Sequence, residues 1–345
     1  MKGIITLSYR CLYFCLLSWL LVACQSSDTY PTDYEQLSED ERLVIRFSHV
    51  VGEDTPKGMA ARKFAELVKE QSNGYIEVQV FSNSTLYKDS EELDALMSGN
   101  IQMIAPATSK LTHLVPEISV LDLPYAFQTL DEAHNYLQSD VGQELAEKLQ
   151  EHNLYSVGIW DSGFKQLSNN VNPIHTFSDL AGLNMRIMPS DILHKQFEIA
   201  GANSKKTDFN TVFNELQKGS VDGQENTLSN ISSKNLYSLQ NYLTISNHGY
   251  LGYLILFNYE FWNGLSPDVQ DILVSALQEV QQWQWDLVNE LNTQKLKEIE
   301  QCECVDIYIL PEDEKERWEK AFEPVYRFYK KQYPDHYIQA LPKFS

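Results

Sequence analysis

The chain has 345 residues, and 27 Lys and Arg stand against 48 Asp and Glu, which gives a formal net charge of −21 at pH 7. Nucleic acids and anionic membrane surfaces require a basic face, so this charge argues against both as partners. The hydrophobic fraction of 43% and the charged fraction of 22% are typical of globular proteins. The length is sufficient for two domains with separate cores.

The N-terminal segment has the pattern of a lipoprotein signal peptide. Lys2 and Arg10 precede an apolar run over residues 11–23, and Cys24 follows directly after Ala23. A membrane-spanning helix needs about 20 apolar residues, so the run indicates a secretory signal over residues 1–23. The bacterial lipobox pattern predicts lipidation of Cys24 and a membrane anchor, and the alternative is an ordinary signal peptide that contains cysteines.

The mature chain begins with short alternating elements. Residues 24–42 are mostly polar and predict a hydrated tether. Thr55 and Pro56 predict the start of a helix that ends near residues 72–74, because threonine caps a helix and proline suits its first position. Apolar patterning predicts further strands at 43–50, 75–81, 101–105 and 155–160, and helices at 89–98 and 130–152.

The second half repeats this rhythm. It predicts strands at 185–188, 250–257 and 304–310, and helices at 191–200, 211–218 and 267–300. Strands separated by helices favour the α/β class with parallel crossovers. The helix at 267–300 would be about 50 Å long, more than one domain's diameter, and is expected to cross two domains. The alternative is two helices with a break near residues 289–293.

Motifs for catalysis or metal binding are absent from the sequence. There is no nucleophile elbow, P-loop, H-E-x-x-H or dinucleotide fingerprint, and the eight histidines never stand three or four residues apart. Cys302 and Cys304 could chelate a metal or form a disulfide, and two free thiols are the expectation. Neither an enzyme, a cofactor nor a metal is predicted.

Cations and amides near strand ends are candidate anion-binding groups. Arg186 interrupts an apolar run at 183–189, where a buried guanidinium needs a partner such as a ligand carboxylate. The alternatives are an internal salt bridge and an edge residue whose charged end extends to solvent. Asn226 ends a polar turn at 221–226 and could bind a ligand or cap the next helix. Trp160 and Lys165 lie just past a predicted strand end, where open α/β sheets bind ligands.

Ordered blocks of sequence carry a family resemblance. They are FSHVVGEDTPKGMAARKFAELV at 47–68, ELDALMSGNIQMIAPATSK at 92–110, DLAGLNMRIMPS at 179–190, LQKGSVDGQENTLSNI at 216–231 and LTISNHGYLGY at 243–253. From about residue 43 to about residue 341, the chain resembles the solute-binding proteins of TRAP transporters, the DctP family. The first two blocks look most like the C4-dicarboxylate branch.

The resemblance implies a two-lobe periplasmic-binding-protein-like fold with a hinge and a long helix shared by both lobes. Lobe I would comprise residues 43–163 and about 250–288, and lobe II residues 164–249 and about 289–345. It also implies a periplasmic monomer that closes on a small organic anion and delivers it to the small and large membrane subunits of a TRAP permease. The alternatives are a ligand-sensing lipoprotein that acts with a receptor and a lipid-anchored enzyme, for which the sequence nominates no catalytic residue.

The resemblance further implies the site. Arg186 would grip the ligand carboxylate, Asn226 would lie close to that group, and Lys57 would be a second anchor. Without the family, Lys57 is a solvated lysine in the first turn of a helix. Thr108 and Trp160 are further expected ligand contacts.

Lys165 departs from the family pattern. The family's D-N-G-F-R is here D-S-G-F-K, so a lysine stands where an arginine is usual. A lysine cannot donate two parallel N–H bonds, so Lys165 would either reach a ligand carboxylate through one bond or a water, or leave room for a bulkier ligand. The competing interpretation is that Lys165 points to solvent and another residue, such as Lys57, carries the second charge. Thr227 also replaces a usual proline. These differences predict relaxed dicarboxylate specificity while organic-anion binding is retained.

Overall fold

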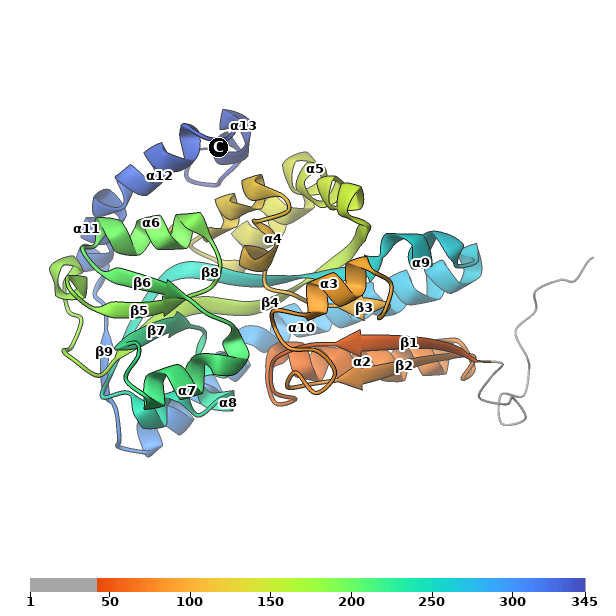
Figure 1. Ribbon diagram of the computed structural model, residues 1–345, viewed down its shortest axis with the longest axis horizontal. Helices are drawn as coiled ribbons and strands as arrows, with labels where there is room; N and C mark the ends of the chain where they lie inside the picture. The colour runs from red at the N-terminus through yellow and green to blue at the C-terminus, as the bar shows by residue number, and fades with distance from the viewer. Residues whose placement is uncertain (1–41, 345) are drawn as a thin grey trace, which may run out of the picture.

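The computed structural model describes residues 42–344 (Figure 1). Within them, one sheet has the order β2-β1-β3-β8-β4-β7-β5-β6, and β9 pairs with β8. The strands are β1 (Leu43–Ser48), β2 (Ile76–Phe81), β3 (Met103–Ile104), β4 (Leu154–Asn169), β5 (Asn184–Ile187), β6 (Asn203–Lys206), β7 (Gly223–Asn226), β8 (Tyr242–Asn258) and β9 (Asp306–Ile309).

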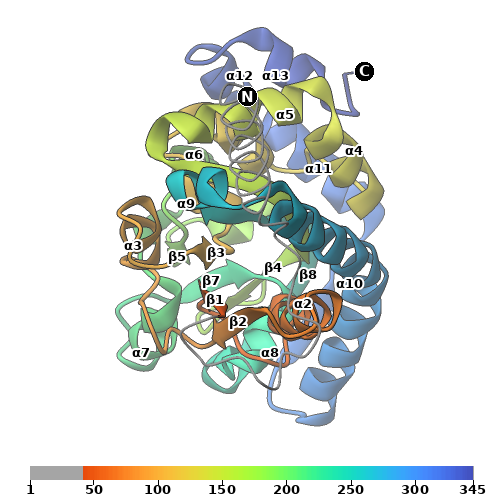
Figure 2. The same ribbon diagram turned by 90° about the vertical axis from the view of Figure 1, so that its right-hand side faces the viewer.

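Helices surround this sheet (Figures 1 and 2). They are α2 (Pro56–Gln71), α3 (Glu92–Met97), α4 (Leu130–Gln138), α5 (Asp140–Lys148), α6 (Asp191–Ile199), α7 (Val212–Gln217), α8 (Leu228–Ser233), α9 (Tyr259–Gly264), α10 (Pro267–Gln301), α11 (Glu312–Ala321), α12 (Glu323–Lys330) and α13 (Asp335–Gln339). Two 3₁₀ helices near the site are η3 (Thr108–Leu111) and η7 (Phe209–Thr211).

The sheet is mixed, which corrects one prediction. The α/β class is confirmed, but parallel crossovers do not connect all the strands. The long central strands β4 and β8 are antiparallel to each other, and they also pair antiparallel with β7 and β3 respectively. The strands on each side of them pair in parallel. The prediction failed because the polar continuations of β4 and β8 do not resemble strands, although they are buried.

Strands β4 and β8 connect two halves of the molecule. Figure 1 shows β1, β2 and β3 at one end of them and β5, β6 and β7 at the other. The register between β4 and β8 shifts between Asp161 and Gly163, where Gly163 has a φ of 108°. A β-bulge of this kind bends a strand. It therefore lies where the sequence predicts the boundary between the lobes.

Helix α10 is a single helix, so the alternative of a break near residues 289–293 is wrong. It has 35 residues and packs against α2, β4 and α8, which belong to both halves (Figure 2). Asn292 links two of these elements, since its Nδ2 donates to Ser162 O at 2.9 Å and its Oδ1 accepts from the Ser229 N–H at 2.9 Å. The helix thus supports both sides of the bulge.

The helix predicted at 130–152 divides at Ser139. This residue has extended backbone angles, with φ −70° and ψ 169°, and it ends α4. Its hydroxyl accepts a hydrogen bond from the Gly142 N–H and so begins α5. Serine competes with helix continuation in this way because it offers the backbone a local partner. The amphipathic periodicity continues through Ser139, so the sequence pattern did not predict the break.

Cys302 and Cys304 form a disulfide, which corrects the expectation of free thiols. The predicted strand at 304–310 begins only at Asp306, so the two cysteines lie in the exposed turn after α10. Glu303 between them has a φ of 51°, and their Cα atoms are 5.2 Å apart. That separation is within the range that a disulfide spans. The turn, rather than a strand, brings the sulfurs together.

The signal peptide, Cys24 and all but the last residue of the tether lie outside the described residues. Within residues 42–344, no helix combines the length and the apolar composition that crossing a membrane requires.

Candidate functional site

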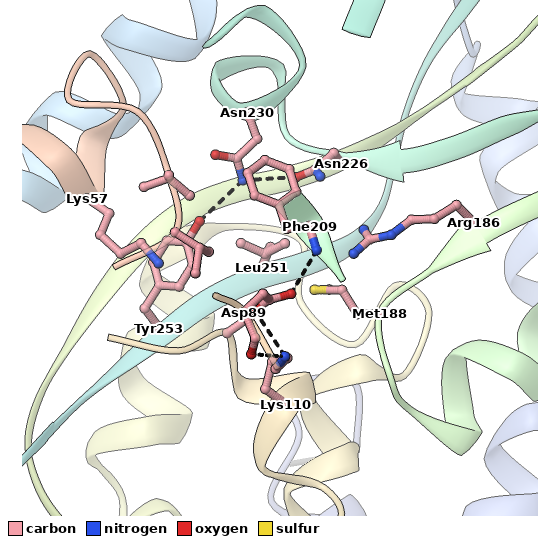
Figure 3. Close-up of a pocket in the computed structure, with 13 residues that line it drawn as sticks. Lys57, Asp89, Lys110, Arg186, Met188, Phe209, Asn226, Asn230, Leu251 and Tyr253 are labelled. Atoms are coloured by element: carbon pink, nitrogen blue, oxygen red, sulfur yellow. Dashed lines mark hydrogen bonds and ion pairs between the residues drawn. The ribbon is translucent and has the colours of Figure 1, made fainter. Parts of the chain in front are cut away.

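A cavity lies between the two halves of the molecule (Figure 3). About 370 Å³ of the cavity and its opening to solvent is free of protein atoms. Its polar lining comes from both halves and consists of Lys57, Asp89, Lys110, Arg186, Asn226, Asn230 and Tyr253. Its apolar lining consists of Val50, Val51, Ala107, Met188, Phe209 and Leu251. The cavity is therefore small and rich in cations and amides.

Arg186 is the strongest indication of an anionic ligand. It lies in β5 and is 1% exposed. Its Nε and Nη2 donate to Thr207 O at 3.0 and 2.6 Å, and no carboxylate of the described residues lies within 4.0 Å of it. Burial lowers the pKa of Arg186, although nearby carboxylates oppose this effect. The internal salt bridge that the sequence left open has no partner among the described residues, and Figure 3 shows the guanidinium directed into the cavity.

Asn226 presents an amide beside this guanidinium. The segment 221–226 was expected to be a turn, but residues 223–226 of it form strand β7, which runs parallel to β5 and ends at Asn226. The Oδ1 of Asn226 accepts from the Thr227 N–H at 3.0 Å and from Asn230 Nδ2 at 2.9 Å. These bonds leave its Nδ2 group without a partner among the described residues, on the side of Arg186 (Figure 3). Both roles that the sequence left open are thus combined, with the oxygen in local bonds and the nitrogen at the cavity.

Lys57 lies on the opposite side of the view from Arg186 (Figure 3). It is in the first turn of α2, but at 1% exposure it is not the solvated lysine expected from its position. Its ammonium donates to Ala105 O at 2.8 Å and lies 3.8 Å from the centroid of the Tyr253 ring. Burial lowers the pKa of Lys57 to about 8. The cavity therefore has a cation at each side.

Asp89 and Lys110 were not identified as site residues from the sequence. The Asp89 carboxylate accepts from the Phe209 N–H at 2.8 Å, and Lys110 Nζ lies 3.1 Å from it. Lys110 is also 3.8 Å from the carboxylate of Asp208. Asp89 lies just before α3, Lys110 lies in η3, and Phe209 begins η7. These contacts therefore join one half of the molecule to the other. Their positions at a helix start and at the end of a sequence block gave no sign of this pairing.

Lys165 lies outside the cavity lining. Its side chain is fully buried and forms an ion pair with Glu225 at 2.9 Å. Glu225 also contacts His248 Nε2 at 2.9 Å. Gly249 pairs with Lys165 across the sheet, and a Cβ at that glycine would lie 2.7 Å from Lys165 Cε. Because Gly249 has no side chain, the side chain of Lys165 can occupy that space.

Trp160 and Thr108 also lie outside the lining. Trp160 is fully buried and packs against Phe47, with ring centroids 5.9 Å apart. Thr108 begins η3 and is 3% exposed, next to the lining residue Ala107. Of the six ligand contacts expected from the sequence, the structure thus places Arg186, Asn226 and Lys57 at the cavity.

Comparisons with known proteins address the family. The profile of the family described as bacterial extracellular solute-binding protein, family 7 (DctP), matches residues 47–332. The C4-dicarboxylate-binding protein DctB of Bacillus subtilis is 43% identical over 312 residues, which cover 90% of this chain and 89% of that protein. The C4-dicarboxylate-binding periplasmic protein DctP of Rhodobacter capsulatus is 39% identical over 287 residues, which cover 83% of this chain and 86% of that protein.

Solved structures are similar over nearly the same length. A TRAP periplasmic solute-binding protein from Shewanella oneidensis with bound succinate has a TM-score of 0.85 and 34% identity, and the match covers 88% of this chain and 99% of that one. A TRAP periplasmic solute-binding protein from Pseudomonas aeruginosa with bound L-malate has a TM-score of 0.81 and 34% identity. That match covers 83% of this chain and 100% of the other chain. These matches confirm the two-lobe α/β fold class. The chain belongs to the DctP family of bacterial extracellular solute-binding proteins.

Proposed function

We propose that this protein is the solute-binding subunit of a TRAP transporter and that it captures a C4-dicarboxylate. The observation that carries the proposal is Arg186, a fully buried cation that faces the cavity without a carboxylate partner among the described residues. A buried, unpaired charge is strongly unfavourable, and a ligand carboxylate would compensate it. Relatives named for C4-dicarboxylates and similar structures that hold succinate or L-malate support the ligand class.

The cavity offers separate positions for two carboxylates. One would accept from the Arg186 guanidinium and from Asn226 Nδ2, since a guanidinium can donate two parallel N–H bonds to a carboxylate. The other would accept from Lys57, whose ammonium has donors beyond the one bonded to Ala105 O. Leu251 and Met188 line the cavity in the same region and would contact the carbons between the carboxylates (Figure 3).

We propose that the lobes are those expected from the sequence, 43–163 with about 250–288 and 164–249 with about 289–345. The bulge between Asp161 and Gly163 and the lining of the cavity from both halves support this division. The C-terminal segment contacts both lobes, because α12 packs against α6 while Tyr136 and Lys148 donate to Tyr337 of α13. It would accompany closure as a second connection.

The proposed partners are the small and large membrane subunits of a TRAP permease, to which the protein would deliver its ligand as a periplasmic, lipid-anchored monomer. The anchor rests on the pattern at Ala23 and Cys24. Replacing Cys24 by Ala should abolish palmitate labelling and release the protein from membranes, and equal labelling of the variant would contradict the anchor. No feature of residues 42–344 favours the ligand-sensing alternative.

Titration calorimetry tests the ligand class. The mature protein is titrated with succinate, L-malate, butyrate and galactonate. We expect binding of the two dicarboxylates and much weaker binding of butyrate, because butyrate leaves Lys57 or Arg186 without a carboxylate. Tight binding of galactonate with no heat from either dicarboxylate would replace the proposed ligand class by sugar acids.

A further inference from the structure

Glu92 is a buried carboxyl group that the proposed binding of a dicarboxylate does not use. It begins α3 and is 1% exposed. Neither of its carboxylate oxygens has a hydrogen-bond partner among the described residues, and no cation of those residues lies within 4.0 Å of it. A buried carboxylate without partners is costly as an anion and much less so when protonated. The surroundings of Glu92 therefore favour the neutral form.

The charges around the cavity indicate when Glu92 would be protonated. Lys57, Lys110 and Arg186 contribute three positive charges to the lining, and Asp89 contributes one negative charge. If Glu92 is ionised, the net charge of these groups is +1. If it is protonated, the net charge is +2, which matches a dicarboxylate dianion. Asp208, whose carboxylate lies 3.8 Å from Lys110, is left out of this sum because it lies outside the lining and is partly exposed to solvent. Desolvated charges that remain uncompensated are unfavourable, so the ligand favours the protonated form.

We propose, on the basis of the function proposed above, that Glu92 holds a proton while a dicarboxylate occupies the cavity, so that capture of the dianion takes up a proton at mildly alkaline pH. The proton comes from solvent and goes to a carboxylate oxygen of Glu92. No bond of the ligand changes. Glu92 would act through Lys57 and through the net charge of the cavity rather than by contact with the ligand.

The pKa values of the nearby groups give the direction and the pH range. Burial raises the pKa of Glu92 to about 8, while Lys57 opposes the increase. Burial lowers the pKa of Lys57 to about 8, while Glu92 and Asp89 oppose the decrease. Near pH 8, Glu92 and Lys57 together hold fewer than two protons on average, whichever of the two groups carries them. The negative charge of the ligand raises both pKa values, so binding draws protons from solvent.

The other titratable or charged groups near Glu92 are Asp89, Lys110, Tyr253 and His49. Asp89 precedes Glu92 in the chain and Lys110 of η3 pairs with Asp89. Strands β3 and β8 pack against α3, and β3 consists only of Met103 and Ile104. On β8, burial raises the pKa of Tyr253 to about 12, so this residue stays neutral. His49 also lies near Lys57, and burial lowers its pKa to about 3, so it stays neutral as well.

Infrared difference spectroscopy reads the proton on Glu92 directly. Spectra of the mature protein are recorded with and without saturating succinate at pH 8.5, where both ligand carboxylates are ionised. We expect succinate to produce a new absorption of a protonated carboxyl group. That band should be absent in Glu92→Gln, which has the same size and no titrating group. The matched control is Glu91→Gln, because Glu91 is the exposed neighbour of Glu92, and it should retain the band.

Calorimetry in buffers of different ionisation enthalpy provides the second measurement. We expect net proton uptake on succinate binding at pH 8.5 and none at pH 6.5, where Glu92 and Lys57 are already protonated. Affinity should therefore fall above pH 8, by up to about tenfold per pH unit for each linked proton. Succinate binding without proton uptake at pH 8.5, or a carboxyl band that persists in Glu92→Gln, would overturn the proposal. An absence of succinate binding at pH 6.5 would instead contradict the proposed function.

Discussion

Among the described residues, the guanidinium of Arg186 is held in the cavity by one backbone oxygen, that of Thr207. Its two bonds to Thr207 O fix the plane of the group, and the remaining donors are directed to the space where a ligand would lie. A carboxylate placed there would recover the electrostatic free energy that burial removes from the cation. Binding affinity at this site should therefore depend on the shape of the cation as well as on its charge.

Replacing Arg186 by Lys should weaken succinate binding strongly. The ammonium cannot donate two parallel bonds, and truncating a buried, hydrogen-bonded charge pair costs about 2–5 kcal/mol, or about 30- to 5000-fold in the dissociation constant. Calorimetry measures the change. Arg46→Lys on the exposed side of β1 is the matched control and should bind normally. A weakening of less than about threefold in Arg186→Lys would assign this residue a structural role.

Lys165 should govern stability more than affinity. It compensates Glu225 inside the sheet. Burial opposes the ionisation of Glu225, but Lys165 and the hydrogen bond with His248 lower its pKa to about 2. Removing one partner of a buried pair typically costs 3–5 kcal/mol, whereas an exposed pair contributes about 0–1 kcal/mol. Denaturant unfolding should therefore show a large loss for Lys165→Met. The loss should be small for Lys205→Met, which breaks the exposed pair with Glu215.

The variant Lys165→Met also tests the ligand contact expected from the sequence. If Lys165 binds the ligand, Lys165→Met would lose succinate affinity while its free energy of unfolding changed little. If the ion pair with Glu225 persists in the bound protein, the free energy of unfolding would change and the affinity of the folded fraction would not. Calorimetry and denaturant unfolding on one preparation separate these results.

At the level of elements, the bulge in β4 and the helix α10 act together. Gly163 has a backbone conformation that side chains disfavour, and a Cβ there would lie 2.9 Å from Asn292 Nδ2. Asn292 uses that nitrogen to donate to Ser162 O. The glycine thus allows the bend in the strand and the contact between strand and helix at one position.

Gly163→Ala should therefore destabilise the protein more than the backbone conformation alone requires. Gly182 is the matched control, because its φ is 84° and a Cβ there would meet no atom of residues 42–344 within 4 Å. An alanine with positive φ costs about 1–2 kcal/mol at either position. The loss of the Asn292 hydrogen bond should add about 1 kcal/mol at position 163. Equal free energies of unfolding for the two variants would show that the contact with α10 contributes nothing.

At the level of the whole molecule, the structure has contacts that join the two lobes around the cavity. The Asp89 carboxylate accepts from the Phe209 N–H, and Thr112 donates to Pro189 O at 3.1 Å. A ligand held from both sides would add to these contacts and stabilise the closed arrangement by its differential affinity for it.

Solution scattering should show this closure. We expect a smaller radius of gyration with saturating succinate than without it, because the ligand shifts the population toward the closed form. The variant Arg186→Lys at the same succinate concentration is the control, and its radius should stay close to the ligand-free value. An unchanged radius in the unmodified protein, together with calorimetric evidence of binding, would contradict closure about the bulge.

Elements with strong local signals could be predicted from the sequence. Thr55 and Pro56 begin α2 as expected, because helix capping depends on neighbouring residues alone. Helix α10 follows from apolar periodicity that no Gly or Pro interrupts after its start. The sequence did not predict the helix break at Ser139 or the polar ends of β4 and β8, because burial against distant segments decides their conformation. The contacts of Asp89 with Phe209 and Lys110 likewise depend on distant segments, so the sequence did not identify Asp89 as a site residue.

The sequence by itself determined that this chain would form an α/β fold with a long shared helix and that Arg186 would lie in a strand. Periodicity, caps and one charge in an apolar run are local properties, and the family resemblance assigned them a function. Only the tertiary structure decided which charges meet. The antiparallel register of β4, with its bulge at Gly163, places Lys165 beside Glu225 and away from the cavity. Among residues 42–344, the tertiary structure also leaves Glu92 without a hydrogen-bond partner, because pairing depends on distances between segments far apart in the chain.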